Sequence, residues 1–237
     1  LTLGALLASP AILSAKITRT VEKTFNVQPG GNFKAATQGG DITIRTADVS
    51  AVRITAKQVI RASSEQEADE ILAKLTLTLE QTGNDVTAEA KYEKRSGGSW
   101  FGSWPPVNVS FEVTVPKHFN LNLNTSGGDI EAASLQGNVR ARTSGGNMKF
   151  DRVDGEIDAH TSGGDIVLRE GTARAKLGTS GGDIEVDRAG GPTQVSTSGG
   201  DITINSVAQL LSATTSGGNV RAPLPEPMKQ DAVLSTS

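Results

Sequence analysis

The sequence predicts an all-β protein: a single-chain β-solenoid (β-helix) with 18 residues per coil, preceded by an antiparallel strand meander that carries one short helix. Three observations predict this fold. The phrase Thr-Ser-Gly-Gly, followed by Asp or Asn, returns every 18 residues, at Thr125, Thr143, Thr161, Thr179, Thr197 and Thr215. Apolar and polar residues alternate twice within each unit. Aromatic residues make up only 4% of the chain while glycines number 27, which suits thin stacked layers better than a thick globule. A short fixed period is the sequence signature of a solenoid.

Residues 1–15 are predicted to be the remnant of a secretory signal peptide. They are apolar, with small residues before Lys16. This composition is typical of the hydrophobic region and cleavage zone of such a peptide. The stretch is shorter than the roughly 20 apolar residues that cross a membrane. The alternative is a buried N-terminal strand or helix, but export is favoured, so no membrane span is expected in the mature chain.

Residues 16–62 are expected to form the first strands and the first coil. A short strand is predicted over 21–27, followed by a turn at Pro29-Gly30-Gly31. Residues 33–44 repeat the later phrase, with Gln38 in place of serine, and are interpreted as a first coil separated from the others by an insertion. Alternation over 52–56 indicates a half-buried strand.

Residues 63–118 are interpreted as that insertion, with both a helix and strands. Serine ahead of Glu65 and Glu67 is a helix-start signal, and apolar residues at helical spacing predict a helix over 65–74. Strands are predicted over 75–79, 86–92 and 107–115, with a turn at 82–85 and Pro116 ending the last strand. We expect these strands to form one antiparallel meander.

Both tryptophans lie in the loop between the second and third of these strands, in a setting rich in Gly, Ser and Pro. Trp100, Phe101 and Trp104 could form an exposed aromatic tip that contacts a partner, a glycan or a lipid surface. The alternative, which is favoured, is a long hairpin loop whose rings fold back on the strands.

Residues 119–237 are predicted to be the β-solenoid of 18-residue coils. Each unit divides into two strands and two turns, which favours a flattened or L-shaped coil, and Ile130, Ile166, Ile184 and Ile202 should stack over one another. About five inward side chains, at roughly 1.5–3 kcal/mol for each large one, do not offset the ordering of a coil at about 1–2 kcal/mol per residue. Stacking is therefore required. The pattern does not fix the handedness. The final residues resemble the start of another phrase, and we expect the natural protein to continue.

The corner of every unit is predicted to be structural. Glycine allows positive φ in a tight corner and lets stacked backbones approach closely. Asp or Asn next to it accepts hydrogen bonds from nearby turn N–H groups. The corner residues are Gly127, Gly128, Asp129, Gly145, Gly146, Asn147, Gly163, Gly164, Asp165, Gly181, Gly182, Asp183, Gly199, Gly200, Asp201, Gly217, Gly218 and Asn219.

Stacking would bring Asp165, Asp183 and Asp201 into one column, where a bound calcium ion could offset their mutual repulsion. Calcium-binding nonapeptide arrays need a Gly-Gly-x-Gly-x-Asp spacing, which is absent here. Asn147 and Asn219 also occupy the column, so charge is not required there. Turn capping is the favoured interpretation, and no metal or cofactor is expected.

No residues form a recognisable catalytic motif. Glu131, Lys149, Glu185 and Arg221 share the outward position of the first strand of their units, which keeps a polysaccharide-active enzyme open as an alternative. His118 and His160 are isolated in sequence, and the chain has no cysteine. A net charge of −3 does not mark a nucleic-acid-binding protein.

The leader, the strand-rich first segment, Val-Pro before the coils and the Thr-Ser-Gly-Gly-Asp-Ile units together resemble a bacterial "putative adhesin" family, a β-strand-repeat-containing domain of unknown function of the head-GIN and auto-transporter-adhesin-like kind. The resemblance covers most of the chain from about residue 25. It implies a β-solenoid fold and a location in the envelope or at the cell surface, and it brings no catalytic residues.

The favoured interpretation is a non-enzymatic exported scaffold that binds an envelope protein or a glycan. Its expected location is the periplasm, the outer membrane surface or the extracellular space. The alternatives are a polysaccharide-active β-helix enzyme and a calcium-binding repeat module. The sequence does not name the partner or the oligomeric state.

Overall fold

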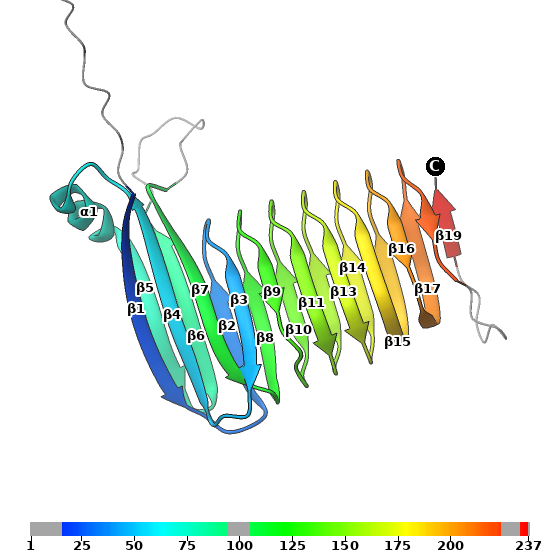
Figure 1. The fold of residues 1–237 in the computed structure, drawn as a ribbon, viewed down its shortest axis with the longest axis horizontal. Helices are drawn as coiled ribbons and strands as arrows, with labels where there is room; N and C mark the ends of the chain where they lie inside the picture. Colours follow the sequence, from blue (N-terminus) through cyan, green and yellow to red (C-terminus); the bar gives the residue numbers. More distant parts are fainter. Residues whose placement is uncertain (1–15, 94–104, 224–232, 237) are drawn as a thin grey trace, which may run out of the picture.

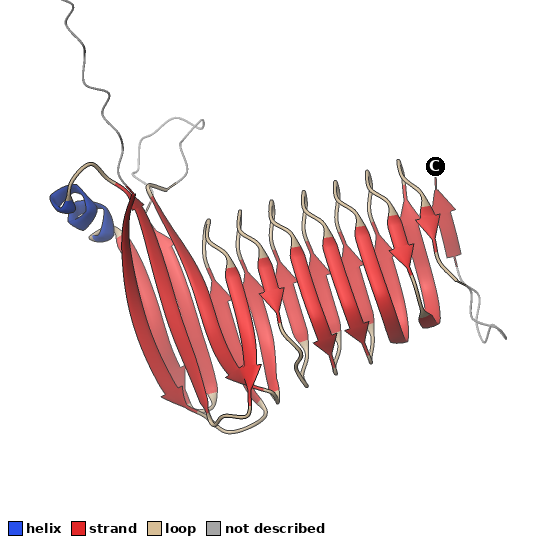
Figure 2. Ribbon diagram, in the orientation of Figure 1, coloured by secondary structure: helices blue, strands red, loops and turns tan. Residues whose placement is uncertain are grey.

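The protein is all-β, solenoid-like and elongated, with its single described helix near one end and the last strand at the other (Figure 1). The computed structural model describes residues 16–93, 105–223 and 233–236. The strands form two ladders that face each other across the core, and turns join them along both long edges (Figure 2). Residues 1–15, and with them the predicted signal peptide, lie outside the described residues.

Ladder A begins with antiparallel strands and continues with parallel ones. In spatial order it contains β1 (Lys16–Asn26), β4 (Ala51–Arg61), β7 (Val107–Pro116), β3 (Ile42–Ala47), β9 (Ile130–Ala132), β11 (Met148–Val153), β13 (Ile166–Gly171), β15 (Ile184–Ser196), β16 (Ile202–Ile204) and β18 (Val220–Arg221).

Ladder B faces ladder A. It contains, in spatial order, β5 (Leu75–Thr82), β6 (Asp85–Tyr92), β2 (Gly31–Ala36), β8 (Phe119–Asn124), β10 (Val139–Arg142), β12 (Ile157–His160), β14 (Ala175–Gly178), the second half of β15, β17 (Val207–Thr215) and β19 (Val233–Thr236). The long strand β15 passes through a corner and therefore belongs to both ladders.

One strand from ladder B, a Thr-Ser-Gly-Gly corner and one strand from ladder A make up a layer. Equivalent residues of successive layers pair in register: Ile130 pairs with Met148, Met148 with Ile166, Ile166 with Ile184, and Ile184 with Ile202. The predicted isoleucine column is thus present, with Met148 completing it. Alternation along each short strand places one set of side chains in the core and the other in solvent.

The layer formed by β2 and β3 lies between two others. Phe33 pairs with Val86 on one side and with Leu121 on the other, while Ile42 pairs with Phe111 and Ile130. The insertion therefore supplies a layer of its own. The expected single meander is wrong, because β7 leaves the β5–β6 hairpin and pairs with β3 and β4 in the opposite ladder.

The helix end of the molecule is closed by β1, β5 and α1 (Glu65–Leu72). The first strand starts at Lys16 rather than at residue 21, because all eleven residues of β1 pair with β4. Lys23 Nζ donates to the carbonyl of Leu79 at 2.7 Å and so links β1 to β5 across the end of the core. The helix begins where expected, capped by Ser64, and ends at Leu72, two residues earlier than predicted.

The core is one continuous apolar column between the ladders. Phe33, Phe111, Phe119 and Phe150 are fully buried in it. Leu135, Val153 and Val207 lie between the two strands of their units and are buried at the edge opposite the Thr-Ser-Gly-Gly corners. At the last layer, Thr215 pairs with Thr236, whereas Thr197 and Thr215 are 18 residues apart in sequence. No helix in the described ranges is long and apolar enough to cross a bilayer.

Candidate functional site

The threonine of each corner is buried and joins adjacent layers. Thr161, which is 0% exposed, donates its hydroxyl to the carbonyl of Gly146 in the preceding layer at 2.9 Å. The same oxygen accepts the N–H of Gly164 in its own corner at 3.4 Å. The arrangement recurs at Thr125, Thr143, Thr179, Thr197 and Thr215. The repeated threonine is therefore a structural residue with both hydrogen-bonding roles satisfied.

The two glycines of the corner have different environments. A Cβ on the second glycine of a corner, such as Gly182, would lie 2.1 Å from the carbonyl oxygen of Gly164 in the preceding layer. A Cβ on the first, Gly181, would meet its nearest atom at 3.5 Å, an ordinary contact. Positive φ occurs at Gly30 and Gly83 and at no other described residue. The prediction of positive φ at the corners is therefore wrong. Close approach of the stacked backbones explains why the second position of the corner is glycine, but it does not explain the first.

The Asp or Asn that follows caps the next layer. Asp165 Oδ1 accepts the backbone N–H of Asp183 at 2.8 Å, and Asp183 Oδ1 accepts the N–H of Asp201 at 2.7 Å. Asn147 Oδ1 likewise accepts the backbone N–H of Asp165 at 2.8 Å. Since either side chain supplies the accepting oxygen, Asp and Asn are interchangeable here. The donor belongs to the neighbouring layer rather than to the turn itself.

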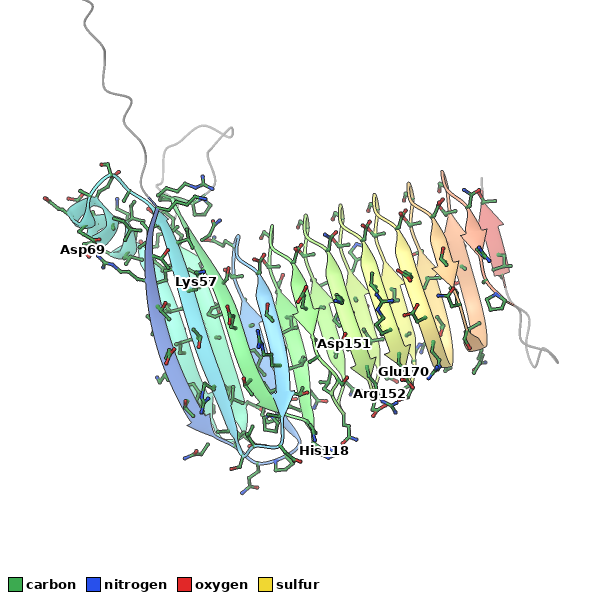
Figure 3. All side chains as sticks on the ribbon, viewed as in Figure 1. Lys57, Asp69, His118, Asp151, Arg152 and Glu170 are labelled. Carbon is green, nitrogen blue, oxygen red and sulfur yellow. The ribbon has the colours of Figure 1, made fainter. Side chains whose placement is uncertain are left out.

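This column gives little support to the calcium alternative. One oxygen of each of Asp165, Asp183 and Asp201 is already bonded to a backbone N–H. In the described part of the chain, no group of three or more His, Cys, Asp or Glu side chains is placed to hold a metal ion. The two histidines belong to different segments: His118 precedes β8 (Figure 3), and His160 is the last residue of β12.

The outward residues considered for catalysis form a row across ladder A. Lys149 pairs with Glu131, and Glu185 lies two strands beyond Lys149, with Arg221 two strands further. Glu131 and Glu185 are thus three strands apart, about 14 Å at about 4.8 Å per strand. Glycosidases place their two carboxyl groups about 5–9.5 Å apart. The row does not bring an acid and a base together.

A second set of charges on ladder A forms ion pairs between strands. Arg169 Nη1 lies 2.7 Å from Asp187 Oδ2, and this hydrogen bond holds the pKa of Asp187 below its usual value. Arg152 lies 3.0 Å from Glu170 at the nearby edge (Figure 3). Because equivalent positions stack in register, alternation of sign avoids like charges on neighbouring strands. The charges of these ion pairs therefore offset one another on the surface.

The outer face of ladder B, in contrast, is hollowed. A groove of about 850 Å³ crosses seven consecutive strands, from β6 to the second half of β15. The outward side chains along it are polar or charged, with no aromatic ring among them. A smaller hollow of about 220 Å³ on ladder A is lined by Arg45, Glu131, Lys149 and Asp151 among others. The groove is the larger and the more extended of these two surfaces.

One side of the groove carries a chain of amide contacts. Asn32 donates to Asp85 at 2.7 Å and accepts from Asn120 at 3.0 Å. Asn120 Oδ1 accepts the N–H of Asn138 at 2.9 Å, and Asn138 Oδ1 accepts the N–H of Glu156 at 2.9 Å. These contacts run across five strands and fix the side chains, so the border of the groove is preorganised.

The middle of the groove is cationic. Lys34, Arg140 and Lys176 lie in one row with Asn122 and Asp158 between them. Within the described ranges, the side chains of Lys34, Lys176 and Arg174 have no ion-pair or hydrogen-bond partner. Asp158 is held by Arg142 at 2.6 Å. The groove therefore presents unpaired cations beside amides in its middle, with the carboxylates Asp85 and Glu156 at its border, and this middle row suits the binding of a polar, anionic partner.

A family model described as Toastrack DUF4097 matches residues 32–237. The chain belongs to this family. The match confirms the resemblance to a bacterial adhesin-like family of unknown function that the repeats suggested. No curated protein matches the Toastrack chain.

Several solved structures are similar to it. One is described as a putative lipid binding protein from Parabacteroides distasonis, with 15% identity over 92% of this chain and 94% of that chain and a TM-score of 0.44. Another is a putative adhesin from Bacteroides fragilis, with 11% identity over 92% and 97% of the two chains and a TM-score of 0.42. A putative cell adhesion protein from Clostridium sporogenes has 9% identity over 92% and 100%, with a TM-score of 0.33.

Sequence reasoning did not find the groove of the Toastrack chain. It considered Glu131, Lys149, Glu185 and Arg221 as outward charges and did not single out Arg140, Asp158 and Lys176, which pair in one row on ladder B. The signal was available, since these residues recur every 18 positions in one row. Lys34 holds the same place in its unit, three residues before the threonine position of the phrase, but the insertion separates that unit from the others in sequence. The loop with Trp100, Phe101 and Trp104 lies outside the described residues.

Proposed function

We propose that this Toastrack chain is a non-enzymatic, exported protein of the cell envelope that binds an envelope protein or glycan along the outer face of ladder B. The observation that carries the proposal is the groove of about 850 Å³ with its unpaired cations. Concave surfaces with a few convergent polar groups are the usual place for ligands. An extended groove of this kind fits an extended partner better than a small compact one.

The scaffold itself supports a binding role. We take each 18-residue unit as one coil of the solenoid, in line with the register of Met148, Ile166 and Ile184. Buried threonine hydroxyls and the Asp or Asn oxygens join every coil to the next. A surface held this way loses little conformational freedom on binding, which reduces the free-energy cost of association.

The absence of catalysis is part of the proposal. Glu131 and Glu185, the two carboxylates of the outward row on ladder A, are too far apart for glycoside hydrolysis, and Asp158 in the groove is bonded to Arg142. Export is proposed from the apolar residues 1–15 ahead of Lys16. Expression of the natural gene and N-terminal sequencing of the protein recovered from the cell envelope tests it, with a new terminus near residue 16 expected. Recovery only from the cytoplasm would contradict export.

The groove is tested with isolated cell envelopes of the source bacterium, in a co-sedimentation assay at low salt. Lys176→Glu reverses a charge in the groove, and Lys149→Glu makes the same change on the outer face of ladder A. Both lysines are exposed and have no ion-pair partner among the described residues. We expect Lys176→Glu to reduce co-sedimentation and Lys149→Glu to leave it unchanged. Equal behaviour of the two variants would refute the assignment of the groove.

A further inference from the structure

The middle row of the groove has a regular charge pattern. Lys34 pairs with Asn122, Asn122 with Arg140, Arg140 with Asp158, Asp158 with Lys176, and Lys176 with Gln194. A cation therefore stands on every second strand. Since neighbouring strands lie about 4.8 Å apart, the cations recur at about 9.6 Å along the groove.

The residues between the cations carry little net charge. Asn122 and Gln194 are amides, which both donate and accept hydrogen bonds. The carboxylate of Asp158 lies 2.6 Å from Arg142, a residue outside this row, and 3.9 Å from Arg140. Its charge is therefore offset by Arg142, and Arg140 keeps most of its donors for a ligand.

We infer that the groove binds a linear acidic polysaccharide in which an acidic sugar alternates with a neutral one. This inference rests on the proposed function and names the ligand class for the same groove. The carboxylates would face Lys34, Arg140 and Lys176, since charge-assisted hydrogen bonds to such groups are the strong ones. The neutral sugars would place hydroxyls against Asn122 and Gln194. The interval between cations is comparable to the length of two sugars in an extended β-linked chain.

Other polyanions fit this spacing less well. In an extended acidic peptide, side chains on one face recur at about 6.6–6.8 Å. A peptide would also be expected to pair with a strand edge, whereas the groove is the face of a sheet and offers side chains only. The phosphate charges of one nucleic acid strand in a duplex recur at about 3.4 Å along the helix axis. The two-strand interval of the cations therefore favours the alternating polysaccharide.

The test uses the purified full chain and hyaluronan, in which glucuronate alternates with N-acetylglucosamine, in a calorimetric titration at low salt. Lys34→Gln and Lys176→Gln should each weaken binding about fivefold, the ratio for one unit-charge contact at about 4 Å in water. The matched control, Lys149→Gln on ladder A, should leave the affinity unchanged. Thermal unfolding of all three variants confirms that they fold, as expected for exposed side chains.

Three further ligands decide the ligand class. Polygalacturonate carries a charge on every sugar, dextran carries none, and poly-glutamate is an acidic peptide. Preference for hyaluronan over all three supports the inference. Absence of hyaluronan binding, or binding of any of the other three at least as tight, overturns it. The proposed function survives either result if Lys176→Glu still reduces envelope binding, and fails if that variant binds envelopes like the wild type.

Discussion

Replacing each of the two glycines of one corner by alanine should have different effects on stability. In Gly182→Ala, the new Cβ would lie 2.1 Å from the carbonyl oxygen of Gly164, 2.4 Å from its carbon and 2.6 Å from Asp165 Oδ1. Two of these three atoms are backbone, so the layers themselves must separate. In Gly181→Ala, the nearest atom is the carbonyl oxygen of Gly163 at 3.5 Å, and φ is not positive. That substitution meets no obstacle.

The magnitude follows from the contacts that cross this gap. Separation strains the hydrogen bond from Thr179 to Gly164 and that from Asp183 to Asp165, both 2.8 Å long. Each is worth about 0.5–1.5 kcal/mol, and overpacking adds about 1–3 kcal/mol. Gly182→Ala should therefore lower the free energy of unfolding by about 2–6 kcal/mol. Gly181→Ala should be neutral or raise it by about 0.4–1 kcal/mol, because alanine restricts the unfolded chain.

The assay is thermal unfolding followed by circular dichroism, with urea unfolding as a second measurement. At about 2–4 °C per kcal/mol for a chain of this size, Gly182→Ala should lower Tm by about 4–24 °C, while Gly181→Ala leaves it nearly unchanged. The pair Gly163→Ala and Gly164→Ala, one layer earlier, should repeat the contrast. Equal losses within a pair, or a larger loss at the first glycine, would refute the close-approach argument.

Three further predictions concern the same columns and the ion pairs. Thr161→Val removes a buried hydroxyl that bonds to Gly146 and Gly164, and should cost about 1–3 kcal/mol in urea unfolding. Thr161→Ser keeps the hydroxyl and should lose less; equal losses would assign the effect to shape. Arg169→Gln should raise the pKa of Asp187, measured by carbon-13 NMR titration, because the present hydrogen bond lowers it. A carboxyl whose pKa is lowered on folding stabilises the protein at pH values above its pKa in the unfolded chain, about 4. This contribution is lost as the pH falls through the pKa of the folded state. The free energies of unfolding of wild type and variant should therefore converge at low pH, and a difference that persists there would show that the ion pair is not its cause. Millimolar Ca²⁺ should leave Tm unchanged, because Asp165, Asp183 and Asp201 already cap backbone N–H groups; a rise in Tm would restore the calcium alternative.

The stacking of the repeats was predictable because the period and the inward alternation are both local. Ile130, Ile166 and Ile184 occupy the same place in their units, and the alternation gives the face. The threonine was missed as a structural residue, because its bond to the preceding layer involves residues from another unit. The positive-φ explanation failed for a similar reason: the constraint on Gly182 comes from the neighbouring layer rather than from its own turn.

The N-terminal half was harder to predict, because its pairing is not sequential. The strand run of β5, β6 and β7 has the composition of a meander, yet β7 pairs with β3 and β4 on the other ladder. No local pattern distinguishes the two arrangements. The groove depends on the same long-range pairing, since Lys34 reaches the row of Arg140 only through β8.

Lysine footprinting tests the central claim, that the outer face of ladder B is the binding surface, most directly. The protein is acetylated with and without isolated cell envelopes, and the modified lysines are quantified by mass spectrometry. Binding along ladder B should protect Lys34 and Lys176, while Lys57 and Lys149, both exposed on ladder A, should react as in the free protein. Protection of Lys57 and Lys149 with free reaction of Lys34 and Lys176 would contradict the claim.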